Sequence, residues 1–168
     1  MKIKYQHLLG REWIHGDQDC YTILQDIYKD NLGILLTNYA RPTDWWVHGL
    51  DLYTENFRKE GFEMVDLNDQ EPQLLDVFMI CIPDGRCLKN VVNHCAIYVG
   101  DGLVVHHLGQ RLSECTLYRG YLKRYTSYVI RHKDGPKVLG DPRKAPGTVD
   151  MMALMLPEKR RLLEDVTA

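Results

Sequence analysis

One cysteine and two histidines have the residue types and the spacing that acyl transfer needs. Cys20 precedes a segment with helical periodicity, and His94 and His106 lie on either side of a Gly-Asp-Gly turn. A cysteine thiolate can attack a carbonyl carbon when a histidine takes up its proton and a second polar side chain orients the imidazole. Each residue alone has a plainer structural explanation. Cysteine is among the most buried residue types, and a histidine in a strand is more often a core or surface residue than a catalyst. The three together define a candidate site for nucleophilic catalysis.

The first predicted helix begins at Cys20. Its apolar face consists of Ile23, Leu24, Ile27 and Tyr28, which recur at helical intervals. Asp17 and Asp19 stand just ahead of it and are N-cap candidates, and Gly33 is a helix stop. The partial positive charge of a helix N-terminus favours thiolate and lowers a cysteine pKa from about 8.5. This position suits a nucleophile.

The two histidines are brought together by a predicted hairpin. A three-residue loop at 100–102, with Gly102 in the left-handed conformation, would place His106 opposite Ala96. The other pairs would be Val99 with Leu103 and Tyr98 with Val104. His94 and His106 would then share one face, about 7–8 Å apart between Cα atoms. A two-residue loop would present His107 on that face instead, so the choice of second histidine depends on register.

The other elements predict helices followed by strands. A second helix is expected from Thr43 or Asp44 through Phe57, ending at Gly61, with Trp45 and Trp46 as core residues rather than a binding platform. Strands are expected from Phe62 onward, at 77–82, 91–99, 103–107 and 127–132, with a helical turn at 118–121. We therefore expect a domain over residues 1–132 in which helices precede strands.

Residues 133–168 differ in composition from the rest of the chain. A Pro/Gly-rich linker leads to the apolar run 151–156 and then to a charged segment that begins at Pro157. A contiguous apolar patch that does not reach its own core usually marks a binding surface. We expect an extended C-terminal arm that binds a partner, and the alternative is an extra helix folded on its own domain.

Composition excludes several classes of function. The chain has 168 residues and a net charge of −2, which gives no electrostatic case for nucleic acid or an anionic membrane as partner. We expect no signal peptide and no membrane span, since no apolar run is long enough. Five cysteines, an odd number, argue against a disulfide framework and for a reducing compartment.

A zinc site is a weaker alternative. Its ligands would be Cys81, Cys87, His94 and Cys95. The Cys-x5-Cys interval is wider than the usual tight pair, and neighbouring strand residues point to opposite faces of a sheet. We therefore expect no metal and no cofactor.

The motifs around the candidate site resemble those of the NlpC-type cysteine peptidases, and in particular the peptidase domains of phage tail assembly proteins. The resemblance covers roughly residues 8–132 and is carried by segments 11–16, 19–21, 45–46, 52–57, 61–62, 93–102 and 106–108. It implies a papain-like α+β fold, with N-terminal helices packed on a central antiparallel β-sheet. Many bacterial members carry tyrosine in place of Trp13, a small residue in place of Tyr21 and glycine in place of Leu75.

The resemblance also implies roles for individual residues. Cys20 would be the nucleophile, His94 the general base and His106 the orienting residue. The residues beside the nucleophile that would serve in oxyanion stabilisation or substrate binding are Trp13, Asp19 and Tyr21.

The family typically cleaves peptide stems of bacterial peptidoglycan, which is the implied substrate. The implied partners are phage tail-tip or hub proteins, bound through the arm at 133–168. The protein would be made in the host cytoplasm and carried on the virion at the tail tip. The alternative is a structural tail component that plugs or scaffolds the tip with the same fold and little hydrolysis.

Overall fold

The structure is a computed structural model and describes residues 2–68, 70–86 and 91–136. In this part of the chain six strands form one antiparallel sheet in the order β1-β6-β2-β3-β4-β5. The strands are β1 (Phe62–Val65), β2 (Val77–Ile80), β3 (His94–Gly100), β4 (Leu103–His106), β5 (Glu114–Leu117) and β6 (Thr126–His132). The helices are η1 (Gln6–Leu8), α1 (Cys20–Leu32), α2 (Leu52–Asn56) and α3 (Tyr121–Tyr125). The predicted α+β fold of helices on an antiparallel sheet is confirmed.

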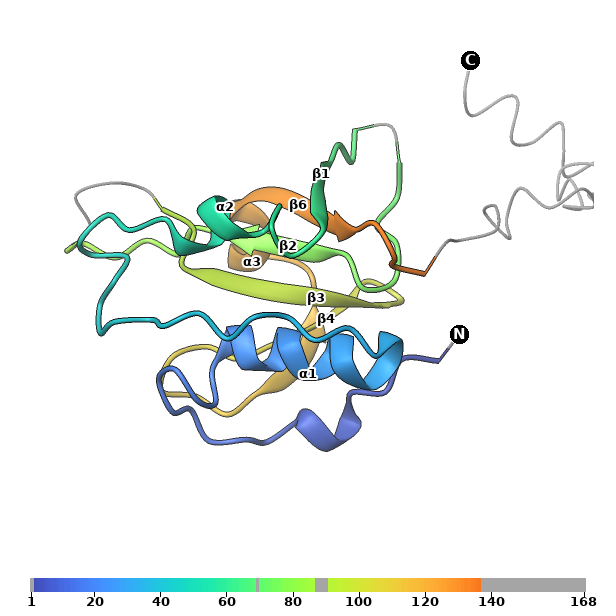
Figure 1. The fold of residues 1–168 in the computed structure, drawn as a ribbon, viewed down its shortest axis with the longest axis horizontal. Helices are drawn as coiled ribbons and strands as arrows, with labels where there is room; N and C mark the ends of the chain where they lie inside the picture. The colour runs from blue at the N-terminus through green and yellow to red at the C-terminus, as the bar shows by residue number, and fades with distance from the viewer. Residues whose placement is uncertain (1, 69, 87–90, 137–168) are drawn as a thin grey trace, which may run out of the picture. The chain divides into compact units, whose positions relative to one another are not determined.

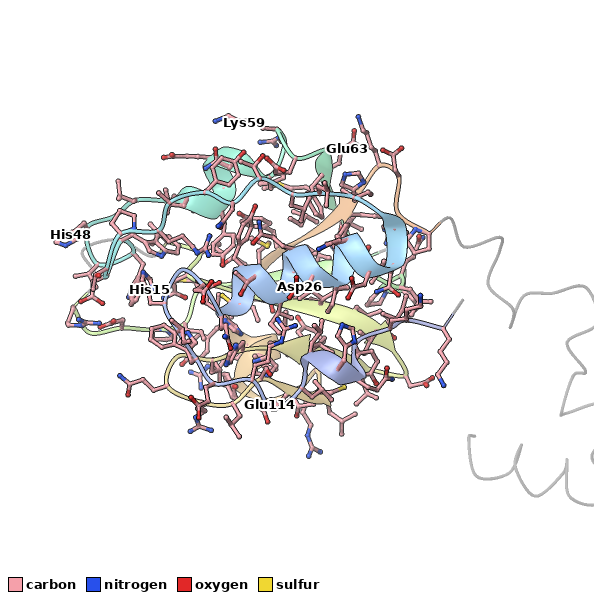
Figure 2. All side chains as sticks on the ribbon, turned by 60° about the horizontal axis from the view of Figure 1, so that its bottom comes forward. His15, Asp26, His48, Lys59, Glu63 and Glu114 are labelled. Atoms are coloured by element: carbon pink, nitrogen blue, oxygen red, sulfur yellow. The ribbon has the colours of Figure 1, made fainter. Side chains whose placement is uncertain are left out.

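Helix α1 begins and ends where the sequence predicts. Asp19 is its N-cap, and a capping box joins the Asp19 carboxylate to the Thr22 backbone while the Thr22 hydroxyl reaches back to the Asp19 backbone. Gly33 ends the helix in the left-handed conformation. The side chains of the predicted apolar face are buried. The helix lies against β3 and β4 (Figure 1). Asp26 lies on the outer side of the helix (Figure 2).

The sheet separates two apolar clusters. The larger cluster lies between the sheet and α1 and includes Cys95 and Ile97 of β3. The smaller cluster includes Ala96 of the same strand, together with Phe78 and Leu122. Alternate residues of a strand point to opposite faces, so the order of residues in β3 decides which side chains meet α1.

The predicted second helix is wrong over most of its length. Residues 43–49 form turns, and only α2, which is capped by Asp51, is helical. Asp44 and Gly49 have φ angles of 54° and 76°, so the chain leaves the helical region at both ends of this turn. Trp45 is buried as expected, whereas Trp46 donates its indole N–H to Asp84 at 3.0 Å.

The β3–β4 hairpin keeps the predicted register by an unexpected route. Ala96 pairs with His106 and Tyr98 with Val104, as predicted, but Gly100 pairs with Leu103. The loop is therefore Asp101-Gly102, with φ angles of 53° and 71°, and a bulge between Tyr98 and Gly100 adds the residue that the loop lacks. Without this bulge His107 would lie opposite Ala96.

Strand β5 was not predicted. It pairs with β4, with Glu114 opposite His106, and forms one edge of the sheet. Its four residues, Glu-Cys-Thr-Leu, give too short a pattern to indicate a strand. The predicted helical turn at 118–121 lies slightly later, as α3, and the predicted closing strand is confirmed as β6.

The arm predicted at 133–168 lies outside the described residues from position 137 onward. Residues 133–136, which are described, follow β6 as a turn. The domain boundary thus stays a prediction. In the described part of the chain no helix is long and apolar enough to cross a membrane.

Leu75 adopts a backbone conformation that favours glycine. Its φ is 70°, its N–H donates to the Tyr98 carbonyl at 2.8 Å, and its carbonyl accepts from the Tyr28 hydroxyl at 2.7 Å. Its side chain is 1% exposed. The left-handed conformation costs about 1–2 kcal/mol for a non-glycine residue, whereas a buried leucine side chain is worth about 2–5 kcal/mol. Burial therefore outweighs strain at this position, so a leucine is stable there despite its positive φ angle.

Substitutions at Leu75 test this balance. We expect Leu75→Ala to lower the free energy of unfolding by about 2–5 kcal/mol, because it loses burial and keeps the strain. Leu75→Gly should be less destabilising than Leu75→Ala, since it also relieves the strain. At Leu24, inside α1, the order should be reversed, with glycine worse than alanine by about 1 kcal/mol. Urea unfolding measures all four variants, and the same order at both sites would contradict the account.

Candidate active site

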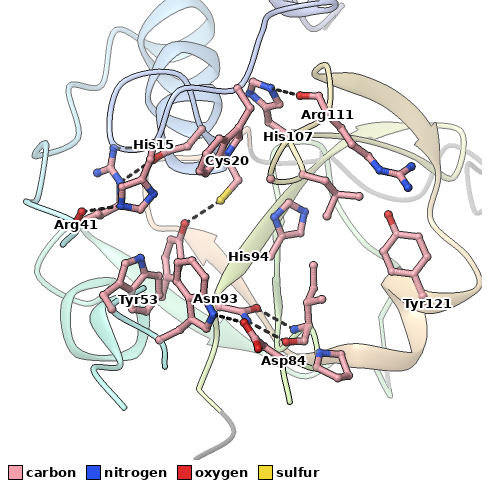
Figure 3. A pocket seen from close by; sticks show the side chains of 18 of the residues that line it. His15, Cys20, Arg41, Tyr53, Asp84, Asn93, His94, His107, Arg111 and Tyr121 are labelled. Carbon is pink, nitrogen blue, oxygen red and sulfur yellow. Dashed lines mark hydrogen bonds and ion pairs between the residues drawn. The ribbon is translucent and has the colours of Figure 1, made fainter. Parts of the chain in front are cut away.

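A pocket of about 690 Å³ lies where the start of α1 meets the start of β3 (Figure 3). Both Cys20 and His94 line it, as the sequence predicts for a nucleophile and its base. The other lining residues are Trp13, His15, Asp19, Arg41, Trp45, Trp46, Tyr53, Ile82, Pro83, Asp84, Gly85, Asn93, His107, Leu108, Gly109, Arg111 and Tyr121. The pocket is therefore built from loops that converge on the first turn of α1.

Cys20 has the environment of a thiolate. The pKa of its thiol lies well below the usual range, mainly because Cys95 hydrogen-bonds to it; burial opposes this shift. Hydrogen bonds and charge from His94, and a hydrogen bond from Tyr53, lower the pKa further. Cys20 is the first residue of α1, where the partial positive charge of the helix N-terminus acts in the same direction.

Two further residues belong to this environment: Tyr53, which the sequence did not single out, and Cys95, which was considered only as a ligand of the zinc alternative. The Tyr53 hydroxyl lies 3.1 Å from the Cys20 sulfur. Burial raises the Tyr53 pKa well above its usual value, so the hydroxyl stays a donor. The Cys95 thiol donates to the Cys20 carbonyl at 3.3 Å, and its hydrogen bond with Cys20, with burial, raises its own pKa. The available signal was strand alternation, which puts Cys95 and His94 on opposite faces of β3, with Cys95 on the face that packs against α1.

His94 and His106 form a buried pair. A hydrogen bond of 3.2 Å joins His94 Nε2 to His106 Nδ1, and the two rings meet edge to face at 5.3 Å. Burial, together with the nearby His94, lowers the pKa of His106 to about 3, so the His106 ring is neutral near pH 7. The hydrogen bond occupies one nitrogen of His94 and leaves Nδ1 for the pocket. This is the arrangement expected of a base and the residue that orients it.

His107 also lines the pocket, whereas His106 is not among the lining residues. His107 is buried, and its Nε2–H donates to the Arg111 carbonyl at 2.9 Å. This bond ties the end of β4 to the loop that follows. The structure thus brings both histidines to the site, with His106 behind His94 and His107 in the wall.

Asp19 lies in the pocket wall, but its carboxylate is engaged by the protein. It accepts from the backbone N–H groups of Gly16, Tyr21 and Thr22 at 2.9–3.0 Å. Arg41 Nε donates to it at 2.8 Å, and both side chains are at most 6% exposed. Asp19 is therefore placed to hold the start of α1.

Trp13 and Tyr21, the other two predicted residues, lie in different surroundings. Trp13 is partly exposed and lines the pocket with Cys20, where its indole N–H is a possible donor. Tyr21 is buried and is not among the lining residues, and its hydroxyl donates to the Thr37 carbonyl at 2.7 Å. Its ring packs against Tyr53 at 5.9 Å. Tyr21 therefore supports Tyr53 rather than bordering the pocket.

Asn93 and Asp84 shape the wall on the other side of the pocket. The Asn93 side chain accepts from Ile82 N–H at 2.8 Å and donates to the Ile82 carbonyl at 2.9 Å. Asp84 accepts from the Trp46 indole and from Arg86. These bonds connect the strand that carries His94 to the turn at 83–86 and to the loop that carries Trp46.

The zinc alternative finds no support in the described part of the chain. No group of three or more His, Cys, Asp or Glu side chains there could hold a metal ion. Cys87, one of the four ligands considered, lies outside the described residues.

Comparison with known proteins points to one family. Residues 7–131 match the family model of the NlpC/P60 family. The chain is 37% identical over 127 residues to the tail tip assembly protein K of Escherichia phage lambda, covering 76% of this chain and 60% of that protein. It is 27% identical over 132 residues to the tail tip assembly protein K of Escherichia phage N15, covering 76% of this chain and 50% of that protein. The matches thus span only part of each relative.

Alkylation of Cys20 tests its environment. Because the pKa of Cys20 is lowered, the iodoacetamide rate should have its pH midpoint below the value of about 8.5 for an unperturbed thiol. Tyr53→Phe removes a donor to Cys20 and should move the midpoint upward. Tyr28→Phe is a matched control, since it removes a buried hydroxyl that binds the Leu75 carbonyl instead.

Mass spectrometry after partial labelling identifies the modified residue. Cys20 should be labelled before Cys115 and Cys87. Faster labelling of either, or equal midpoints for the two tyrosine variants, would contradict the assignment.

Proposed function

Because this chain belongs to the NlpC/P60 family, whose members are generally cysteine peptidases, we propose that it is a cysteine endopeptidase that hydrolyses peptide bonds in bacterial peptidoglycan stems. The observation that carries the proposal is the pairing, in one pocket, of a thiol of lowered pKa with a histidine held by a second, neutral histidine. Cys20 would be the nucleophile, His94 the general base and His106 the orienting residue.

The reaction follows from this geometry. The Cys20 thiolate attacks the carbonyl carbon of the scissile amide, and the thiol proton resides on His94 Nδ1. The Cys20 backbone N–H, at the unpaired start of α1, and the Trp13 indole N–H are the candidate donors to the oxyanion. His94 then protonates the leaving amine, which leaves a thioester on Cys20. A water molecule, deprotonated by His94, hydrolyses that thioester and restores the thiol.

The similarity to two tail tip assembly proteins supports a place in a phage tail. We propose that the protein is a virion component of the tail tip and that residues 133–168 bind tail-tip or hub proteins. Burial of the apolar segment 151–156 would offset the entropy of ordering the arm.

A second candidate function is structural, and the word "assembly" in the names of both relatives favours it. In that case the domain would plug or scaffold the tail tip with little hydrolysis. The two functions are compatible, because the pocket and the arm belong to different parts of the chain.

Digestion of purified peptidoglycan tests the enzymatic proposal. The protein should release new amino groups from sacculi, and Cys20→Ala should release none above background, since the nucleophile is gone. His94→Ala should lower the rate by about 10²-fold or more, because it removes the base. Amine labelling followed by mass spectrometry of the fragments identifies the bond that is cut.

The adjacent histidines supply a matched pair within the same assay. His106→Ala should lose far more activity than His107→Ala, because only His106 contacts His94. The reverse ranking would assign orientation to His107. Full activity of Cys20→Ala, or no activity in the wild type, would contradict the enzymatic proposal and leave only the structural role.

Truncation after Gly135 tests the arm. Tails assembled with the truncated chain should lack the protein, whereas peptidoglycan digestion by the purified truncated chain should be unchanged. In limited proteolysis of the lone protein, the bonds after Arg143 and Lys144 should be cut first. Protection of those bonds, together with unchanged assembly of the truncated chain, would rule out an arm that binds a partner.

A further inference from the structure

Glu114 lies beside the residue that orients the candidate base. It stands directly opposite His106 in the β4–β5 pair, so the two side chains share one face of the sheet. Its carboxylate oxygen Oε1 lies 3.6 Å from His106 Nε2. The Glu114 side chain is 48% exposed, at the surface of the edge strand (Figure 2), whereas the His106 side chain is fully buried. Glu114 is thus the carboxylate at the rear of the histidine pair.

His106 Nε2 is a buried polar atom that has no hydrogen-bond partner among the described residues. The other ring nitrogen, Nδ1, is bonded to His94 Nε2 at 3.2 Å. A neutral imidazole carries one proton, so one nitrogen donates and the other accepts. The proton of His106 therefore resides either on Nδ1, between the two rings, or on Nε2, facing Glu114.

Only one of these tautomers suits a base at His94. If His106 donates from Nδ1, the neutral His94 accepts at Nε2 and carries its own proton on Nδ1, where it cannot take up the Cys20 proton. If His106 accepts at Nδ1, His94 donates from Nε2 and its Nδ1 is free to accept. The second arrangement places the His106 proton on Nε2. It therefore needs an acceptor at that position, because a buried N–H without one is unfavourable.

We propose that Glu114 is a positioning residue whose carboxylate accepts a hydrogen bond from His106 Nε2–H and so selects the tautomer in which His94 can act as base. The carboxylate needs to approach by about half an ångström to reach hydrogen-bond distance, which a half-exposed glutamate side chain achieves by a small rotation. The thiol proton of Cys20 moves to His94 Nδ1 only. No proton is transferred to His106 or Glu114.

The tautomer can be observed without any substrate. In ¹⁵N NMR of the full chain, His106 should show a protonated Nε2 and an unprotonated Nδ1. In Glu114→Ala the His106 spectrum should shift toward the other tautomer, while Glu114→Gln, which retains an acceptor oxygen, should preserve the wild-type pattern. Glu63→Ala is the matched control, because Glu63 is an exposed glutamate on β1, the opposite edge strand (Figure 2). Unchanged His106 shifts in Glu114→Ala would overturn the proposal.

Kinetics supply the second readout, and this part rests on the proposed hydrolase function. Glu114→Ala should lower kcat by about tenfold, the effect of one hydrogen bond to a charged group, with KM unchanged. Glu114→Gln should recover most of the rate, and Glu63→Ala should match the wild type. Equal rates for Glu114→Ala and Glu63→Ala would overturn the proposal. A wild type that shows the expected tautomer but no hydrolysis would contradict the proposed function and leave the inference standing.

Discussion

The geometry around Cys20 depends on one buried carboxylate, that of Asp19. It caps α1 through the N–H groups of Tyr21 and Thr22, and it also holds Gly16 and Arg41. A buried ion pair is stable only when its remaining hydrogen-bonding groups are satisfied, and Arg41 meets this condition by donating to the carbonyls of Gly16 and Tyr39 as well. One charge thus sets the helix start and joins it to two loops of the pocket.

The ionisable groups near Cys20 form two sets: hydrogen-bond donors beside the thiol, and a neutral histidine behind His94. On the α1 side, Tyr53 and Cys95 keep their protons because their pKa values are raised, so they stabilise negative charge on Cys20. On the other side, His106 stays neutral because it is buried. A neutral neighbour does not repel the positive charge that would form on His94, whereas a second cation would. Burial thus favours the neutral form on both sides of the pocket. It keeps Tyr53 and Cys95 protonated as donors, and it keeps His106 uncharged behind His94.

The sequence predicted the elements that have a strong local signal and missed those that depend on distant contacts. The ends of α1 follow from Asp19 and Gly33, and the pairing of Ala96 with His106 follows from the hairpin. The predicted long second helix failed because Asp44 and Gly49 take left-handed conformations, which apolar periodicity does not reveal. Tyr53 and Glu114 reach the site only through tertiary packing, so no local pattern marks them. The roles of the site residues themselves remain predictions.

The bulge in β3 separates the geometry of the site from the count of residues along the chain. The bulged residue lies between the turn and the pair formed by Ala96 and His106. A chain from which this residue is deleted would keep the same two-residue turn and the same pair. The interval between the two histidines would then be one residue shorter with the same rings in contact. A search for distant relatives that demands a fixed interval would miss such chains. In related chains we expect the two histidines to keep their shared face of the sheet, rather than a fixed number of residues between them.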